Sequence, residues 1–217
     1  WKQAHFSERY FEVDADFLSE ALTLKKIDAG LAVYLKSVFE DERKIEATLR
    51  DLVSRPEIEL RRPVTDADWS AWIYKTDSPL AEKGGDEYSA ATDEQVEVCQ
   101  RLFRFPLSVV TGPAGTGKTT VIEALVRAVR RSEGEGANIL VLAPTGKAAD
   151  RAREVFEAAS LTRVETVTIH SFLASNGWLA KNLTFRRHGG KRAAVGTLIL
   201  DEASMLDLEL AAALFRA

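Results

Sequence analysis

Apolar residues follow two patterns along the chain, and the pattern changes near residue 92. Before it, short β-rich runs and a charged helical repeat predominate. After it, the apolar runs "LSVVT", "NILVLA", "VTIHSFL" and "TLILDEA" alternate with helical segments. Strands that are apolar throughout are typical of a parallel sheet covered by helices on both faces. The pattern predicts an α/β domain over 92–217, preceded by a small α+β module with its linker over 1–91.

The first module begins with a predicted hairpin. The runs "LTLKKI" and "LAVYL" flank Asp28-Ala29-Gly30, where the glycine can adopt the positive φ of a turn. A charged helix follows, with Ser37 and Glu40 spaced as a capping box and Pro56 as a stop signal. We expect this helix to bury one apolar stripe.

The stretch over 57–91 predicts less regular structure. "ADWSAWIY" fits a helix or a strand, and Trp69 and Trp72 fit a core stripe or a stacking surface, the core being favoured. "SPLAEKGGDEYSAATD" is typical of a loop, and we expect the domain boundary at Gly84-Gly85.

Composition narrows the possible partners. The net charge is −4, with 29 basic and 33 acidic side chains, so any contact with nucleic acid must come from a local patch. The single Cys99 cannot form an internal disulfide, which is typical of the reducing cytoplasm. No apolar stretch approaches the ~20 residues of a membrane span, and no signal peptide begins the chain, so we expect a cytoplasmic protein without a membrane partner. Trp1 indicates a piece of a longer chain.

A phosphate-binding loop is the most specific motif. "GPAGTGKT", from Gly112 to Thr119, fits G-x-x-x-x-G-K-[ST] and lies between an apolar run and a helical segment. Such a loop wraps backbone N–H groups around phosphates at a helix N-terminus, while its lysine reaches the β- and γ-phosphates and its last hydroxyl binds Mg²⁺. The predicted nucleotide-binding residues are Gly112, Gly115, Thr116, Gly117, Lys118, Thr119 and Thr120, with Lys118 also catalytic and Thr119 also a metal ligand.

Two carboxylates complete the predicted hydrolytic site. Asp201 ends the apolar run of "TLILDEAS", where a strand of an α/β sheet presents its side chains to ligands. We expect Asp201 to hold Mg²⁺ and Glu202 to orient or deprotonate the attacking water. The two motifs together predict hydrolysis of a nucleoside triphosphate, with ATP and Mg²⁺ as cofactors.

A second Gly-Lys pair follows another apolar run, in Pro144-Thr145-Gly146-Lys147. It is not a second triphosphate site, because Val141 occupies the place of the first glycine and Pro144 lacks the N–H that a cradle needs. A hydroxyl, a lysine and a helix N-terminus suit a single phosphate, such as one along a nucleic-acid strand. "VTIHSFL" gives a similar strand end with Thr168 and His170. The basic "KNLTFRRHGGKR", over 181–192, is either a solvated loop or a DNA-facing patch, and we expect Gly189-Gly190 to turn a hairpin in it.

The segments "GPAGTGKTT", "LAPTGKAADR", "TIHSFL" and "LILDEASMLD" resemble, in order and spacing, the RecD-like DNA helicases of superfamily 1B. That family includes the exodeoxyribonuclease V alpha subunit and stand-alone relatives, with roles in DNA recombination and repair. The resemblance implies a RecA-like motor lobe that moves on single-stranded DNA or at duplex ends, with recombination-repair subunits as possible partners. It also implies an adenine contact for Gln95, in "TDEQ", and DNA contacts for Pro144, Thr145, Thr168 and His170.

The resemblance leaves other functions open. The chain is alternatively the helicase segment of a conjugative relaxase, or a regulatory DNA-binding ATPase without a motor role. The family pattern continues beyond Walker B with a further strand and with an arginine from a second lobe, which this chain does not include. An arginine of that kind contributes roughly 10³–10⁵ in rate. We therefore expect these 217 residues alone to bind nucleotide but to hydrolyse ATP poorly and not to unwind DNA.

Overall fold

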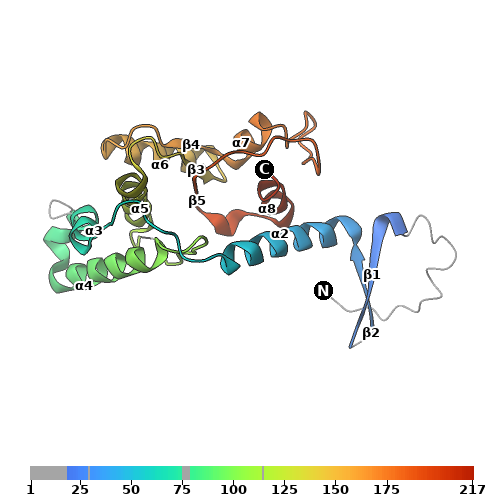
Figure 1. Ribbon diagram of the computed structural model, residues 1–217, viewed down its shortest axis with the longest axis horizontal. Helices are drawn as coiled ribbons and strands as arrows, with labels where there is room; N and C mark the ends of the chain where they lie inside the picture. Colours follow the sequence, from blue (N-terminus) through green and yellow to red (C-terminus); the bar gives the residue numbers. More distant parts are fainter. Residues whose placement is uncertain (1–18, 29, 75–78, 114) are drawn as a thin grey trace.

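The computed structural model describes residues 19–28, 30–74, 79–113 and 115–217 (Figure 1). The chain begins with an antiparallel hairpin of β1 (Leu22–Ile27) and β2 (Gly30–Leu35), in which Ile27 pairs with Gly30. This confirms the predicted hairpin, and Gly30 has a φ of +128° at the end of its turn. Figure 1 shows the hairpin at one end of the molecule, connected to the rest by helix α2.

Helix α2 (Lys36–Ser54) follows β2 without an intervening loop. The predicted capping box at Ser37 and Glu40 is wrong: Leu35 is the N-cap residue, and no side chain caps the helix. Because β2 leads directly into the helix, Ser37 already lies within the first turn. The helix packs against α8 (Leu208–Leu214), with its apolar stripe only half-buried.

Helices α3 (Asp66–Ile73) and α4 (Pro79–Leu102) lie next to the phosphate loop's helix, α5 (Lys118–Glu133). Trp69 is 2% exposed and makes edge-on contacts with Trp72 and Phe103, which confirms the helix and the core interpretation. Together with Cys99 it forms a core shared by the three helices. Burial raises the pKa of the Cys99 thiol to about 12, so this thiol is inert.

The described part of the predicted loop, over 79–93, is instead the first part of α4. Gly85 interrupts this helix with φ +45° and ψ −125°, a backbone conformation that only glycine adopts readily. Gly85 therefore produces a kink in a helix rather than a linker. The proposed division between 1–91 and 92–217 falls inside α4, and α3 shares its core with α5 across that division.

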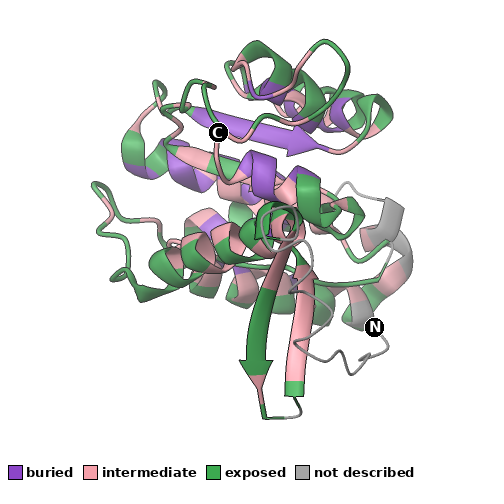
Figure 2. Ribbon diagram, turned by 90° about the vertical axis from the view of Figure 1, so that its right-hand side faces the viewer, coloured by how far each residue is buried: buried purple, intermediate pink, exposed green. Residues whose placement is uncertain are grey.

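Three parallel strands form the central sheet, in the order β4–β3–β5. They are β3 (Ile139–Ala143), β4 (Glu165–Thr168) and β5 (Thr197–Leu200). Every residue of β3 is buried (Figure 2). On one face Ile139 and Val141 pack against α5 and α6 (Gly146–Ala158), while on the other Leu140 and Leu142 pack against α7 (Ile169–Ser175) and α8. The α/β prediction is confirmed.

The predicted strand "LSVVT" is wrong. Residues 107–111 are irregular, and Val109 is 74% exposed. A strand needs a hydrogen-bonded neighbour, and no described segment pairs with the outer edge of β5. β5 is therefore an edge strand of the described sheet, and its Leu198 side chain is 44% exposed.

Candidate functional site

The phosphate loop connects the irregular segment to α5, and two glycines shape it. Gly115 and Gly117 have φ values of +83° and +80°, and Gly117 is the N-cap residue of α5. At Gly112 a Cβ would lie 2.8 Å from the Thr116 hydroxyl oxygen, so the loop also requires a missing side chain there. Ala114 lies outside the described residues. The backbone thus has the tight curl that a phosphate cradle needs.

Lys118 lies over this loop. Its Nζ donates to the carbonyl oxygens of Gly112, at 2.9 Å, and of Pro113, at 2.8 Å. The Thr116 hydroxyl also donates to Pro113, at 2.9 Å. A phosphate oxygen carries a full charge and accepts a stronger hydrogen bond than a neutral carbonyl. The ammonium is therefore held within the loop by acceptors that a phosphate can replace.

Gln95 of α4 contacts the same loop. Its Nε2 donates to the carbonyl oxygen of Thr116 at 3.0 Å, and a Cβ on Gly117 would lie 2.5 Å from that nitrogen. The residue that the resemblance assigned to the nucleotide therefore lies against the loop. Thr119 and Thr120 lie half-buried in the first turn of α5.

Asp201 and Glu202 directly follow β5. The Asp201 N–H donates to the Leu142 carbonyl at 2.9 Å, and its carboxylate accepts from the Glu202 N–H at 2.9 Å. Glu202 has a φ of +49° and begins the 3₁₀ helix η2 (Ala203–Met205). A left-handed residue other than glycine is strained by about 1 kcal/mol or more, and such strain is common at functional sites.

The Lys118 ammonium and the Asp201 carboxylate each form hydrogen bonds within their own segment, Lys118 to the phosphate loop and Asp201 to Glu202. Among the described residues, Lys118 forms no ion pair with Asp201 or Glu202, and no cluster of three or more metal-ligating side chains forms. The hydroxyl of Thr119 and the carboxylate of Asp201 are oxygen donors of the kind that Mg²⁺ prefers, with phosphate oxygens and water as its other ligands. The donor set therefore fits Mg²⁺ bound with a nucleotide.

The second predicted edge is formed by two helix caps. Thr145 caps α6, accepting from the Ala148 N–H at 3.3 Å, and Thr168 caps α7, accepting from the Ser171 N–H at 3.1 Å. Ala143, two residues before Thr145, pairs with Thr168 across the sheet. The structure therefore brings both threonines to neighbouring strand ends. Pro144, between the end of β3 and Thr145, is half-buried.

His170 is exposed in the first turn of α7, and its ring centroid lies 5.8 Å from that of Phe185. Phe185 belongs to the basic 181–192 stretch, so that stretch adjoins the second edge. Gly189-Gly190 does not turn a hairpin: the chain reverses near Leu183, where Leu179 and Phe185 form an isolated bridge. Gly190 instead leaves room for the ring of Trp178.

Sequence reasoning missed one cluster of charged residues, in which Glu40 and Asp41 of α2 meet two arginines. In the sequence these carboxylates belong to a run of mixed charges that predicts a solvated helix face. Their partners are Arg187 and Arg216, more than a hundred residues away, so no local pattern identifies the pairing.

A family model for the AAA domain matches residues 95–217, more than half of the chain. The chain belongs to this family. The matched region begins at Gln95 and includes the phosphate loop, both threonine caps and the two carboxylates after β5. The AAA domain of this chain is therefore a P-loop NTPase of the α/β class.

The chain is also similar to several curated proteins. It is 31% identical over 174 residues to the ATP-dependent RecD2 DNA helicase of Deinococcus radiodurans, covering 80% of this chain and 20% of that protein. It is 30% identical over 162 residues to the RecBCD enzyme subunit RecD of Haemophilus influenzae, covering 68% and 25%. An uncharacterised protein of Methanocaldococcus jannaschii is 29% identical over 181 residues, covering 81% and 15%.

The chain thus spans a quarter or less of the length of these relatives. The matches confirm the resemblance to RecD-like helicases and a helicase/NTPase family. Within the part of the chain that the structure describes, no helix has the length and apolar character needed to cross a bilayer.

Proposed function

We propose that this AAA domain is the nucleotide-binding lobe of a RecD-like, ATP-dependent DNA helicase that couples Mg-ATP hydrolysis to movement on single-stranded DNA. One observation carries the proposal: the carboxyl edge of the sheet has two chemically different parts. Asp201 follows β5, while the capping threonines follow β3 and precede α7 on the neighbouring strands. One part suits a metal-bound triphosphate, and the other suits single phosphates along a strand.

At the first part, the loop glycines and the N-terminus of α5 bind the phosphates, and Lys118 neutralises charge on the β- and γ-phosphates. Thr119 and Asp201 hold Mg²⁺, which when bound adds further neutralisation of the phosphate oxygens. Gln95, anchored on the Thr116 carbonyl, contacts the adenine.

Glu202 performs the proton chemistry. It is exposed, and its left-handed backbone turns the chain directly after the metal-binding Asp201. In this place its carboxylate accepts a hydrogen bond from the attacking water, and then the proton as the water adds to the γ-phosphorus. ADP and phosphate are the products.

At the second part, DNA phosphates lie along the edge formed by Pro144, Thr145, Thr168 and His170. Thr145 uses its oxygen as an acceptor for the Ala148 N–H, so its hydroxyl proton remains available to a phosphate. The N-terminus of α6 adds a positive end next to it. His170 supplies an exposed aromatic face of the kind on which bases stack.

The relatives' names suggest where the whole protein acts. One is named an ATP-dependent DNA helicase and another a subunit of the RecBCD enzyme. We propose single-stranded DNA or duplex ends as the substrate, a cytoplasmic location, and a role in recombination or repair, with exodeoxyribonuclease V as the model for a subunit role.

The direct test is Lys118→Ala in the intact protein. Without the ammonium the γ-phosphate charge is not neutralised, so ATP turnover should be abolished, while affinity for labelled oligothymidylate stays near the wild-type value. A coupled ATPase assay measures the turnover, and fluorescence anisotropy measures the affinity for DNA. Loss of DNA binding with unchanged turnover would overturn the assignment.

The reverse effect is expected for Thr145→Asp. Aspartate caps a helix as well as threonine does, so α6 should keep its N-terminus, but the new carboxylate repels a phosphate. Affinity for oligothymidylate should fall by at least about tenfold, with nucleotide affinity unchanged. Thr145→Asn, an uncharged capping residue, is the control, and equal DNA affinity of the two variants would count against this edge as the DNA path.

A further inference from the structure

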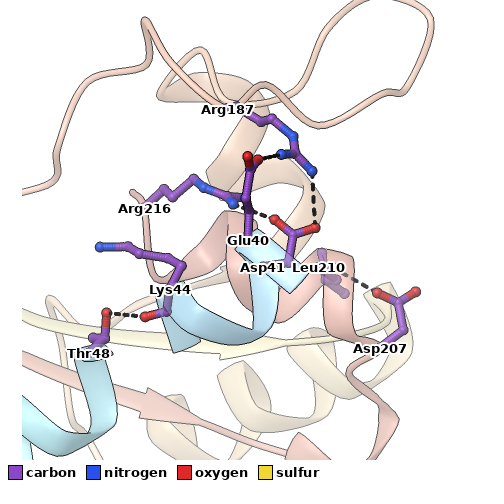
Figure 3. Close-up of polar contacts among 8 residues, drawn as sticks. All are labelled: Glu40, Asp41, Lys44, Thr48, Arg187, Asp207, Leu210 and Arg216. Atoms are coloured by element: carbon purple, nitrogen blue, oxygen red, sulfur yellow. Dashed lines mark hydrogen bonds and ion pairs between the residues drawn. The ribbon is translucent and has the colours of Figure 1, made fainter. Parts of the chain in front are cut away.

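Helix α2 buries only one described side chain, and that side chain is charged. Asp41 is 5% exposed, whereas the apolar residues of the helix are half-buried or exposed. A buried carboxylate is tolerated only where cations and donors surround it. Its partners are Arg216, two residues after α8, through Nη2, and Arg187, whose Nη2 lies 3.6 Å from the second carboxylate oxygen (Figure 3). Arg187 also pairs with Glu40 through Nη1.

The two carboxylates and two guanidiniums balance in charge, so Arg187 is committed to a protein contact. The other cations of the 181–192 segment differ. Among the described residues, none of them forms an ion pair, and all are exposed: Lys181, Arg186, Lys191 and Arg192. One arginine therefore anchors the segment to α2, while four cations remain available to an anionic partner.

Hydrogen bonds to Trp178 and its surroundings keep this segment compact. The Arg186 N–H donates to the Trp178 carbonyl, and the Trp178 indole N–H donates to the Lys191 carbonyl, both at 2.8 Å. The Lys191 N–H donates to the Asn176 carbonyl at 2.8 Å. Near its beginning, the segment places Phe185 against His170. The segment thus lies between α2 and the edge that carries Thr168 and His170.

We propose that Glu40 and Asp41 are positioning residues for the DNA edge: by holding Arg187 they fix the 181–192 segment, and its exposed cations, beside the path of single-stranded DNA. This inference rests on the proposed function, since it adds a second set of contacts to the same DNA path. It assigns a role to α2, which does not contribute to the nucleotide site. It also assigns a role to the basic stretch, in which Arg187 binds α2 and the other cations bind DNA.

The sign of one effect separates positioning from simple electrostatics. Removing two carboxylates makes the protein more positive, so charge alone predicts tighter binding of DNA. Positioning predicts weaker binding, because the released segment must be ordered again when DNA binds. Glu40→Gln/Asp41→Asn in the intact protein should therefore lose affinity for oligothymidylate. The slope of log K against log salt should become shallower by roughly 0.7 for each DNA phosphate that the segment no longer neutralises.

A matched control lies on the same helix. Glu46→Gln/Asp51→Asn also removes two carboxylates, but these pair with Arg50 and Arg55 within the α2 region and leave Arg187 held. Its DNA affinity should equal or exceed that of the wild type. Hydrogen exchange over 178–193, measured without DNA, should be faster in the first double variant and unchanged in the control. Binding of a fluorescent ATP analogue should be the same in all three proteins.

Equal or tighter DNA binding by Glu40→Gln/Asp41→Asn would overturn the inference, as would weaker binding without faster exchange in the segment. A wild-type protein that does not bind oligothymidylate at all would instead overturn the proposed function, a result visible before any variant is compared. If the double variant does not fold, by its near-ultraviolet circular dichroism, Glu40→Gln alone replaces it, because that carboxylate is the more exposed of the two. Glu46→Gln alone, which also removes one carboxylate, is then the matched control.

Discussion

Gly117 lies directly before Lys118, with a φ of +80° and with Gln95 within reach of any side chain added there. Two separate constraints thus act on one residue. The left-handed backbone aims the loop's N–H groups, and the missing side chain lets Gln95 bond to the Thr116 carbonyl. The spacing of glycines in a phosphate loop reflects both backbone shape and close packing.

We expect Gly117→Ala to weaken binding of a fluorescent ATP analogue by about tenfold or more, because a left-handed alanine costs roughly 1–2 kcal/mol and its Cβ displaces Gln95. Fluorescence titration measures the affinity. Gly117→Ala/Gln95→Ala should recover only the part that is due to the steric contact.

Gly134 provides a matched control for that experiment. It has a φ of +96° at the end of α5, but a Cβ there would meet no atom within 4 Å. Gly134→Ala should lower the free energy of unfolding without changing nucleotide affinity. If Gly117→Ala bound nucleotide as tightly as Gly134→Ala, the loop conformation would not be what binds the phosphates.

At the residue scale, the sequence predicts those parts of the site whose residues are close together along the chain. The phosphate loop is such a case, since its glycines, lysine and hydroxyl are consecutive. The two capping threonines are another, because each caps the helix that it precedes. Asp41 is the opposite case: its burial depends on Arg187 and Arg216, and only the folded chain brings them to it.

Among the helices, α3 has a complete capping box. The Thr65 hydroxyl oxygen accepts from the Asp68 N–H at 3.3 Å, and the Asp68 carboxylate accepts from the Thr65 N–H at 2.9 Å. The Thr65 hydroxyl also donates to the Asp68 carboxylate, at 2.8 Å. The hydrogen bonds that the Thr65 N–H and hydroxyl donate, with a smaller contribution from the charge of Arg131, lower the pKa of the Asp68 carboxyl below its ordinary value. A lowered folded pKa adds stability above the unfolded pKa, and that stability is lost as the pH falls through the folded pKa.

Thr65→Ala should therefore have two effects. At neutral pH the free energy of unfolding should fall by about 1 kcal/mol, the usual contribution of such a cap. Below roughly pH 4, where Asp68 becomes protonated in the unfolded chain, the difference from wild type should shrink. Urea unfolding at pH 7 and pH 3, followed by tryptophan fluorescence, measures both, with Thr65→Ser as the variant that keeps the cap. A difference that does not depend on pH would contradict the role of Asp68.

At the scale of elements, sequence patterns identified most strands and helices but misjudged their ends. The hairpin, β3, β4 and β5 are predictable because apolar runs and turn residues are local signals. The first half of α4 is not predictable in this way, because a Gly-Gly pair is typical of loops. In the structure the helix continues through this pair and only bends at Gly85. The start of α2 depends likewise on β2, which leaves no residue free to cap it.

The molecule as a whole places Asp201, Thr145 and Thr168 along one edge of a three-stranded sheet, while the phosphate loop precedes α5 outside the sheet. That edge is set by the order β4–β3–β5, in which the central strand is fully buried and the outer ones are partly exposed. The apolar run around Val109 shows why sequence alone does not specify such a sheet. Its composition suits a strand, but a strand forms only where a neighbour offers hydrogen bonds, and none of the described segments does so.

The central claim is that neighbouring strand ends bind different ligands, a magnesium-bound triphosphate near Lys118 and Asp201 and a DNA strand at Thr145 and Thr168. A structure of the intact protein with an ATP analogue, Mg²⁺ and oligothymidylate tests it most directly. We predict DNA phosphates within hydrogen-bond distance of both threonine hydroxyls, and the triphosphate in the loop before α5. An oligonucleotide bound away from both threonines, with nucleotide in the loop, would contradict the helicase assignment and leave only an ATP-binding domain.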